Sequence, residues 1–150
     1  MKTLDRWRNE DPCDGVATLS RSLPNGVWLN LIVDNVDASL AFQKTVLGAD
    51  VIYADDAFAL VAFAETYWMV HSKKTYEAHP LYPRLPAGAQ PHAGLEIRVQ
   101  GANPDAAAQT ARRDGHQIVQ EPTDTEHGLR EAFILDPDGY VWVPSVPVTT

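Results

Sequence analysis

The stretch that decides the fold of this chain is Gly128-Leu-Arg-Glu-Ala-Phe-Ile-Leu-Asp-Pro-Asp-Gly-Tyr-Val-Trp-Val143. Residues 132–135 are apolar and rich in strand-forming side chains, so they predict a strand. Pro137 then fixes φ and Gly139 accepts a positive φ, which together predict a tight turn. A second strand follows over residues 140–143. The turn alone is typical of any hairpin. It predicts a particular fold only together with a repeat in the chain before it.

The first copy of that repeat begins with a strand over residues 27–33. Asp37 is a plausible N-cap for the helix that comes next, because its carboxylate can accept from the free amides of the first turn. Gly48 stands where a helix commonly ends in a left-handed residue. Three further strands are predicted over residues 50–54, 57–64 and 67–72.

The second copy begins with a strand over residues 93–99. Asn103 and Pro104 mark a helix start, an N-cap followed by proline at the first helical position. The helix continues to Arg113, and Asp114-Gly115 ends it. Three strands come next, over residues 117–120, 129–135 and 140–143, with a loop over residues 123–128. The repeated order predicts an α+β fold of two βαβββ modules, which form curved mixed sheets around a cleft.

The predicted organisation has four segments. Four prolines and a glycine punctuate the segment between the two copies, and the first residues are charged and rich in turn formers. Trp7 is the exception there, and we expect it to anchor this arm on the domain or on a second subunit. The segments are an N-terminal arm (1–26), a first βαβββ module (27–75), a Pro-rich linker (76–91) and a second βαβββ module (92–150).

Composition narrows the class of partner. The chain has 150 residues, 45% of them hydrophobic, which suffices for one domain or for two small halves that share a core. A formal net charge of −8 argues against a nucleic-acid or membrane-surface partner and is compatible with a cationic or neutral small ligand. The single cysteine, Cys13, allows no internal disulfide. Residues 1–10 do not resemble a secretory signal and no apolar run is long enough to span a membrane, so we expect a soluble cytoplasmic protein.

Alternation along the first strand of each copy predicts which side chains line the cleft. Residues 29, 31 and 33, like residues 95, 97 and 99, form the helix-packed faces. Trp28 offers a flat face for stacking or cation–π contact. Glu96 and Arg98 face the same way and can pair with each other or with a ligand. The residues predicted on the opposite faces are Trp28, Asn30, Gly94, Glu96 and Arg98.

Three motifs carry a resemblance to a known superfamily. They are Val33-Asp-Asn-Val-Asp-Ala-Ser-Leu-Ala-Phe-Gln-Lys-Thr-Val-Leu-Gly48, then Leu95-Glu-Ile-Arg-Val99 with Asp114-Gly115 after its helix, and the segment from His127 to Tyr140. Across residues 27–144 the chain resembles the vicinal oxygen chelate superfamily. That superfamily includes glyoxalases, extradiol dioxygenases, bleomycin-resistance proteins and thiol transferases acting on fosfomycin.

The resemblance also implies where a metal would lie. Enzymes of this family hold a divalent ion through His, Glu or Gln from the first and last strand of each half, and use it as a Lewis acid. Three of these positions fall on Trp28, Gly94 and Val143, whose side chains cannot bind a metal. The fourth lies within residues 67–72, where His71 is a candidate. We therefore expect no metal or other cofactor.

The chain resembles most the bleomycin-resistance branch, whose members sequester a cationic drug in metal-free clefts formed between two chains. This implies a homodimer that binds a small cationic or aromatic molecule through Trp28, Asn30, Glu96 and Arg98. His127 stands in the loop before Gly128, where it either packs in the loop or donates a hydrogen bond at the rim of the cleft.

Two alternatives remain open. The first is a metal-dependent lyase, isomerase or dioxygenase of the same superfamily, in which His71, His92 and Glu96 hold a divalent metal in a shifted register. No serine or cysteine has a placed base beside it, so no catalytic residue is predicted. The second is a subunit or regulatory module whose arm and linker make contacts.

Overall fold

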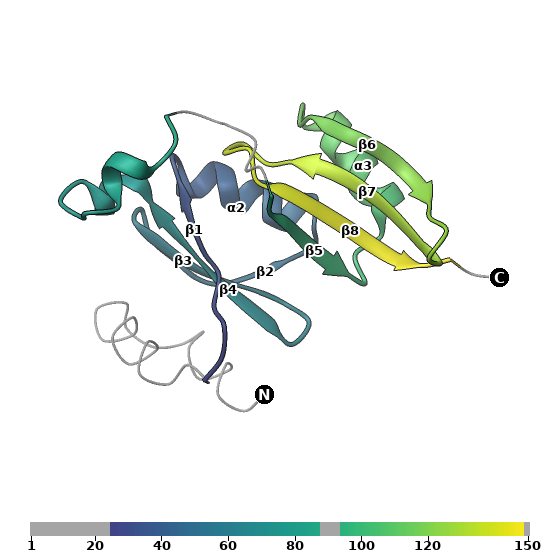
Figure 1. The fold of residues 1–150 in the computed structure, drawn as a ribbon, viewed down its shortest axis with the longest axis horizontal. Coiled ribbons are helices and arrows are strands. Elements are labelled where there is room, and N and C mark those ends of the chain that lie inside the picture. The colour runs from purple at the N-terminus through teal and green to yellow at the C-terminus, as the bar shows by residue number, and fades with distance from the viewer. Residues whose placement is uncertain (1–24, 88–93, 149–150) are drawn as a thin grey trace.

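Two four-stranded sheets, each with one helix, make up the structure, a computed structural model that describes residues 25–87 and 94–148 (Figure 1). The predicted α+β fold of two βαβββ modules is confirmed. The first half contains β1 (Asn30–Val33), α2 (Val36–Thr45), β2 (Asp50–Ala54), β3 (Phe58–Phe63) and β4 (Thr66–Ser72), then the short 3-10 turns Lys73–Tyr76 and Tyr82–Arg84. The second half contains β5 (Glu96–Gln100), α3 (Pro104–Arg113), β6 (Ile118–Asp124), β7 (Leu129–Leu135) and β8 (Val141–Pro147).

The two sheets repeat one pairing pattern. Their strand orders are β1-β4-β3-β2 and β5-β8-β7-β6. In each sheet the first strand pairs in parallel with the last strand, and the other neighbours are antiparallel. Each helix lies within the long connection between the two parallel strands of its sheet. The repeat inferred from the sequence is therefore also a repeat of topology.

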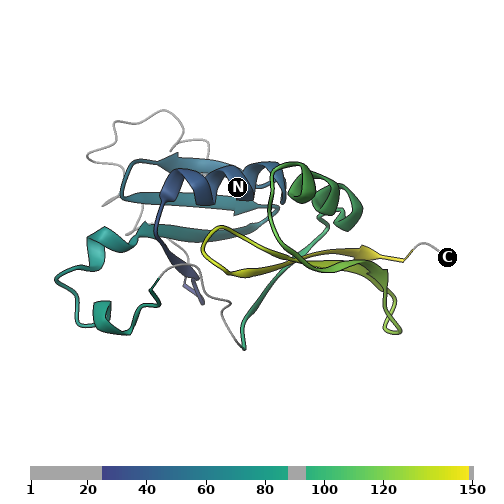
Figure 2. The ribbon, with the colours of Figure 1, turned by 90° about the horizontal axis from the view of Figure 1, so that it is seen from above.

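Each helix buries an apolar side against one face of its sheet. Phe42 of α2 and Ala108 of α3 are fully buried. Leu31 and Val33 of β1, like residues 97 and 99 of β5, point to these helix-packed faces, as their alternation predicted. Figure 2 shows α3 lying over one face of the second sheet. We call the face opposite the helix the open face of a sheet.

The two halves share one core. The rings of Trp68 and Trp142, one from each half, have centroids 5.6 Å apart. Phe42 of α2 lies with its ring centroid 6.4 Å from that of Trp142 and 4.9 Å from that of His116. Buried residues of both halves form one hydrophobic cluster. The relative position of the two open faces is therefore fixed by packing.

The turn over residues 136–139 also joins the halves. Asp138 accepts a hydrogen bond from the backbone amide of Asp34 at 2.6 Å. The Tyr140 hydroxyl donates to the carbonyl oxygen of Ile32 and accepts from its amide, both at 3.1 Å. Asp136 holds the turn itself, since its carboxylate accepts from the amides of Asp138 and Tyr140. This turn thus ties β8 to β1 across the two halves.

The helix starts were predicted with mixed success. Asn103 caps α3 and accepts from two backbone amides, and Pro104 is the first helical residue, as predicted. The prediction that Asp37 caps the first helix is wrong. The cap is Asn35, whose side chain accepts from the amide of Ala38. The earlier start places Val36 in the helix, where it is buried in the core.

The strand limits need larger corrections. The strands predicted from residues 27 and 93 begin only at Asn30 and Glu96. Trp28 therefore lies before β1, and Gly94 lies in a turn with φ of 83°, a left-handed conformation that ends an extended strand. Both strands are short because each ladder with its parallel partner starts at these residues, Asn30 against Met69 and Glu96 against residue 141.

β6 and β8 extend further along the chain than predicted. β6 continues through Pro122 to Asp124, where a loop was expected, and an edge strand tolerates proline. β8 continues through Pro144 to Pro147. Its pairing with β7 is interrupted between Trp142 and Ser145, beside the missing amide of Pro144.

Within residues 25–87 and 94–148, no helix is long and apolar enough to cross a membrane. Trp7, Cys13 and His92, and most of the arm to which Trp7 belongs, lie outside the described residues.

Candidate functional site

A groove of about 480 Å³ lies between the two halves. It runs between the segment that enters β1, the β3–β4 turn, and β5. Its volume falls in the range of about 300–1,000 Å³ that small-molecule sites occupy. Its lining is mostly apolar and comprises Val27, Leu29, Phe63, Ala64, Thr66, Tyr67, Trp68, Leu95, Glu96, Ile97, Arg98, Val99, Gln100 and Trp142.

Glu96 and Arg98 are the charged residues of this lining. Arg98 Nη1 donates to Glu96 Oε2 at 3.2 Å, which is the pairing that the two-residue spacing allowed. Arg98 Nη2 also donates to Glu131 Oε2. Glu131 lies on β7, opposite Ser145 of β8, and its side chain is only 7% exposed. The guanidinium thus neutralises a carboxylate that would otherwise be buried without a partner.

Glu131 is a site residue that the sequence did not single out. Arg98 pairs in register with Val143, one strand away from Glu131, so only the pairing of β5, β8 and β7 brings the two side chains together. His127 lies with Nε2 4.0 Å from Glu131 Oε2, although its own side chain is mostly exposed. The structure therefore gathers the predicted residues Glu96, Arg98 and His127 around Glu131.

An aromatic pair borders the groove. The ring of Trp28 stacks on that of Tyr67 with a centroid distance of 6.3 Å and an interplanar angle of 19°. Tyr67 lines the groove, as do Val27 and Leu29 on either side of Trp28. Tyr67 lines the groove, and Trp28 packs against it from outside the lining. Tyr67 was not among the site residues predicted from the sequence.

Asn30 and His71 lie apart from these residues, on the open face of the first sheet. His71 Nδ1 is 2.6 Å from Asn30 Oδ1, and Asn30 Nδ2 donates to the Tyr76 hydroxyl at 2.8 Å. Burial lowers the pKa of His71 below its usual value, an effect that the charge of Asp55 partly offsets. Asn30 is not among the groove-lining residues, so the structure does not join it to Glu96 and Arg98 as the sequence suggested.

The metal positions implied by the family carry no suitable donor set. Trp28, Gly94 and Val143 offer no ligand atoms through their side chains. Across the described part of the chain, no group of three His, Cys, Asp or Glu side chains could hold a metal ion. His71 and Glu96, two members of the alternative ligand set, belong to no such group. These residues do not fit a divalent ion.

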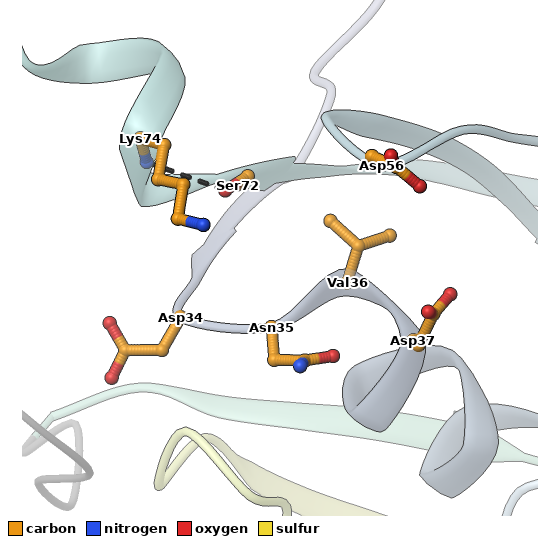
Figure 3. Close-up of a pocket in the computed structure, with 7 residues that line it drawn as sticks. All are labelled: Asp34, Asn35, Val36, Asp37, Asp56, Ser72 and Lys74. Carbon is orange, nitrogen blue, oxygen red and sulfur yellow. Dashed lines mark hydrogen bonds between the residues drawn. The ribbon is translucent and has the colours of Figure 1, made fainter.

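A smaller pocket of about 230 Å³ lies at the start of α2 (Figure 3). Three carboxylates border it, those of Asp34, Asp37 and Asp56. Figure 3 shows that these side chains do not converge on one point. Asp34 is already paired with Lys73 at 2.7 Å, and Ser72 accepts from the amide of Lys74. The pocket is therefore a capped helix start bordered by exposed carboxylates that lie apart.

The buried carboxylate of Asp136 is the most strongly perturbed acid near the junction of the halves. Burial raises the pKa of Asp136 to about 6, although the indole of Trp142 and the amide of Tyr140 donate to it and favour its charged form. The group lies beneath the turn of residues 136–139 and not in the groove, so we assign it to stability.

The fold and the match along the sequence define the class. The Glyoxalase/Bleomycin resistance protein/Dioxygenase superfamily pattern matches residues 27–143, and the chain belongs to that superfamily. The chain is 27% identical over 126 residues to "Putative glyoxylase CFP32" of Mycobacterium bovis and to the protein of the same name in Mycobacterium tuberculosis. The match covers 84% of this chain and 45% of each relative, so the chain spans about half their length.

Solved structures share the fold at low sequence identity. The hypothetical protein SA1046 from S. aureus is 20% identical with a TM-score of 0.65, covering 85% of this chain and 98% of that one. A glyoxalase/bleomycin resistance protein/dioxygenase family enzyme from Burkholderia phytofirmans PsJN is 17% identical with a TM-score of 0.66, covering 81% and 97%. At these identities the likeness is one of fold.

Proposed function

We propose that this protein binds a small cationic molecule with an aromatic or apolar frame in the groove between its halves, without a metal. The observation that carries the proposal is the lining of the groove. Apolar side chains line the groove together with Glu96 and Arg98 of β5, and Tyr67 of β4 lines it from the first half. Such a lining, with a few convergent polar groups, is typical of small-molecule sites.

The sign of the ligand follows from the charges. Glu96 and Glu131 share the one guanidinium of Arg98, so this cluster has one more negative than positive charge. The carboxylate of Glu96 is half exposed at the groove and can pair with a ligand cation. The ring of Tyr67, stacked on that of Trp28, lines the groove and adds a π face that attracts cations. A cationic aromatic ligand satisfies both features at once.

We further propose that the protein acts as a homodimer whose second subunit covers the rim of the groove. Val27 is 97% exposed, and Leu29 and Leu95 are 38% and 43% exposed. All three line the groove, so exposed apolar surface gathers at its edge. Light scattering coupled to size-exclusion chromatography would give the mass in solution. A monomer at micromolar concentration would refute this part of the proposal, and Val27→Asp with Leu95→Asp should convert a dimer to a monomer.

Calorimetric titration with benzyltrimethylammonium and with the anionic benzylsulfonate tests the sign and shape of the ligand. We expect the cation to bind at least about tenfold more tightly than the anion, equivalent to about 1.4 kcal/mol. Glu96→Gln should remove most of this preference, and Trp28→Ala should weaken binding of the cation while leaving the fold intact. Glu121→Gln is the matched control, because Glu121 is an exposed acid on β6 that pairs with Arg112. Equal binding of the two probes would refute the proposal.

Native mass spectrometry of the purified protein gives an independent test, since a co-purified cation would identify the ligand class directly. Elemental analysis of protein purified without chelator belongs in the same experiment. Stoichiometric Zn, Ni, Mn or Fe would favour a metal-dependent enzyme of the superfamily in place of a metal-free binding protein.

A further inference from the structure

The chain itself enters the groove from its N-terminal side. Val27 and Leu29 line the groove and lead into β1, and the chain bends just before them, at Asn25 and Gly26. Both Val27 and Leu29 are exposed, so this end of the groove carries apolar surface that another segment can cover. The residues that precede the bend lie outside the described residues, and they are joined to the chain at the groove.

The sequence just before the bend, Thr18-Leu-Ser-Arg-Ser-Leu23, alternates strictly. Leu19, Arg21 and Leu23 occupy one set of positions, and small hydroxyl side chains occupy the other. A period of two residues is typical of an extended segment that packs one side on a surface and turns the other to solvent. Arg21 is the only charged residue of the segment, so the side with the leucines presents one cation in an apolar frame.

The groove has a complementary lining. Phe63 and Tyr67 supply half-buried aromatic surface, and Glu96 supplies a carboxylate. Glu96 is half exposed although Arg98 donates to it, so a second cation can reach it. The same guanidinium is shared with another carboxylate, which leaves the cluster one negative charge to balance. Leucine side chains fit the apolar walls, and a guanidinium fits the carboxylate.

The tether between this segment and the groove is short. Arg21 lies six residues before Val27. An extended chain spans about 3.3 Å per residue, or about 20 Å over that length. The chain can therefore turn at the bend and return to Glu96, which lines the same groove as Val27. A short tether keeps its end at an effective concentration on the order of 1 mM, so docking within the chain needs only a weak intrinsic affinity.

We propose that residues 18–23 dock in the groove of their own chain, with Leu19 and Leu23 against its apolar walls and Arg21 paired with Glu96, as an internal competitor of the ligand. This role rests on the proposed function, because it concerns the regulation of the same site. The segment offers the groove the chemistry proposed for the ligand, a cation in an apolar frame. Ligand then binds only the molecules in which the groove is open, and its apparent affinity falls in proportion to their fraction. The second subunit proposed at the rim packs outside the segment.

Nuclear Overhauser effects in the full chain test the docking directly. We expect contacts between the methyl groups of Leu19 and Leu23 and the rings of Phe63 and Tyr67. An equimolar mixture of isotope-labelled and unlabelled protein separates contacts within one chain from contacts between two chains. No contact between the segment and these rings, or contacts only between chains, would overturn the proposal.

Two double variants with the same added charge test the competition. Leu19→Asp with Leu23→Asp places two carboxylates on the docking side, and Ser20→Asp with Ser22→Asp places them on the opposite side. If the segment fills about nine grooves in ten, the first variant should bind benzyltrimethylammonium about tenfold more tightly than wild type. The second should bind it as wild type does. Equal affinities of the two variants in calorimetric titration would refute the competitor role.

The two readouts separate the docking from the function proposed for the groove. Contacts between the segment and the rings, with no binding of the cation to any variant, would support the docking and refute the proposed ligand class. Equal binding of the cation to wild type and both variants, with no such contacts, would refute the docking and leave the proposed ligand class in place.

Discussion

The open faces of the two halves have the same geometry and opposite chemistry. The buried positions of β1 and β5 align Asn30 with Glu96 and Ile32 with Arg98. Where the first half has the neutral amide of Asn30, the second half has the carboxylate of Glu96. Where the first half has the apolar Ile32, the second half has the guanidinium of Arg98. One face therefore presents aromatic and neutral groups, and the other presents an ionic cluster.

The partners on the last strand show the same exchange. Ile32 pairs with His71 on β4, whereas Arg98 pairs with Val143 on β8. The guanidinium of Arg98 on β5 pairs with the buried carboxylate of Glu131 on β7 and neutralises it. The repeated backbone fixes where each side chain points. It does not fix what the side chain carries, so one fold can present two kinds of site.

The largest expected effect concerns the core beneath these faces, where Trp142 and Val70 occupy equivalent positions opposite Ile97 and Leu31. Trp142→Ala should lower the free energy of unfolding by about 4 kcal/mol, because it opens a cavity in the shared core. It also removes the indole that donates to the buried carboxylate of Asp136. Urea unfolding followed by circular dichroism measures the loss.

Val70→Ala should cost about 2 kcal/mol in the same assay, since a smaller side chain leaves a smaller cavity. Val119→Ala is the control, because Val119 is 57% exposed and should be neutral. Equal losses of unfolding free energy for Trp142→Ala and Val70→Ala would mean that these equivalent positions of β8 and β4 contribute equally to the core, contrary to this prediction.

The next effect concerns the ionic cluster itself. Arg98→Met leaves the carboxylate of Glu131, 7% exposed, without its cation, and should cost about 2 kcal/mol of unfolding free energy. Glu131→Met leaves only the guanidinium of Arg98, which is 39% exposed and retains Glu96, and should cost less than about 1 kcal/mol. Unfolding in urea gives both values. The reverse order would mean that Glu131 is not buried against Arg98.

Much of the fold could be predicted from local patterns. Asn103 and Pro104 begin α3 as expected, and residues 50–54 and 129–135 form the predicted strands. Gly48 has the predicted left-handed backbone, with φ of 71°. These features depend on near neighbours in the chain. The predicted ends of β6 and β8 were wrong because sheet pairing outweighs the local effect of a proline.

The candidate site could be predicted only in part. Alternation placed Glu96 and Arg98 on one face, because that depends on a single strand. Glu131 and Tyr67 joined them only through strand register and the contact between halves, which one sequence does not reveal. Asn30 failed to join them because His71 and Tyr76, distant in sequence, hold its amide. An acid within a predicted strand was the one signal in the sequence that pointed to Glu131.

A smaller effect concerns the turn of residues 136–139, where Asp136 makes the free energy of unfolding depend on pH. Burial raises the pKa of Asp136 to about 6 from 3.8 in the folded state, so the folded protein binds more protons between these values. Above pH 6 the carboxylate is ionised in both states and its burial lowers stability, so stability from this group rises as the pH falls from 7 to 5. We expect wild type to gain about 1 kcal/mol more than Asp136→Asn over this range.

Urea titrations at pH 7 and pH 5 measure this difference. The equivalent turn of the first half carries Glu65, which is exposed, so Glu65→Gln should follow the wild-type change and is the control. An identical pH dependence in Asp136→Asn and wild type would contradict a raised pKa for Asp136.

The smallest effect concerns the backbone of the same two turns. Ala64, in the β3–β4 turn, has φ of 50°, a left-handed conformation that costs an L-residue about 1–2 kcal/mol, whereas the β7–β8 turn places Gly139 at φ of 84°. Ala64→Gly should raise the free energy of unfolding by about 0.5 kcal/mol, because relief of that cost exceeds the entropy that glycine loses on folding. Gly139→Ala should lower it by about 1 kcal/mol for the converse reason. Urea unfolding of both variants checks the signs, and a loss of stability in Ala64→Gly would show that contacts of the Ala64 methyl group outweigh the backbone term.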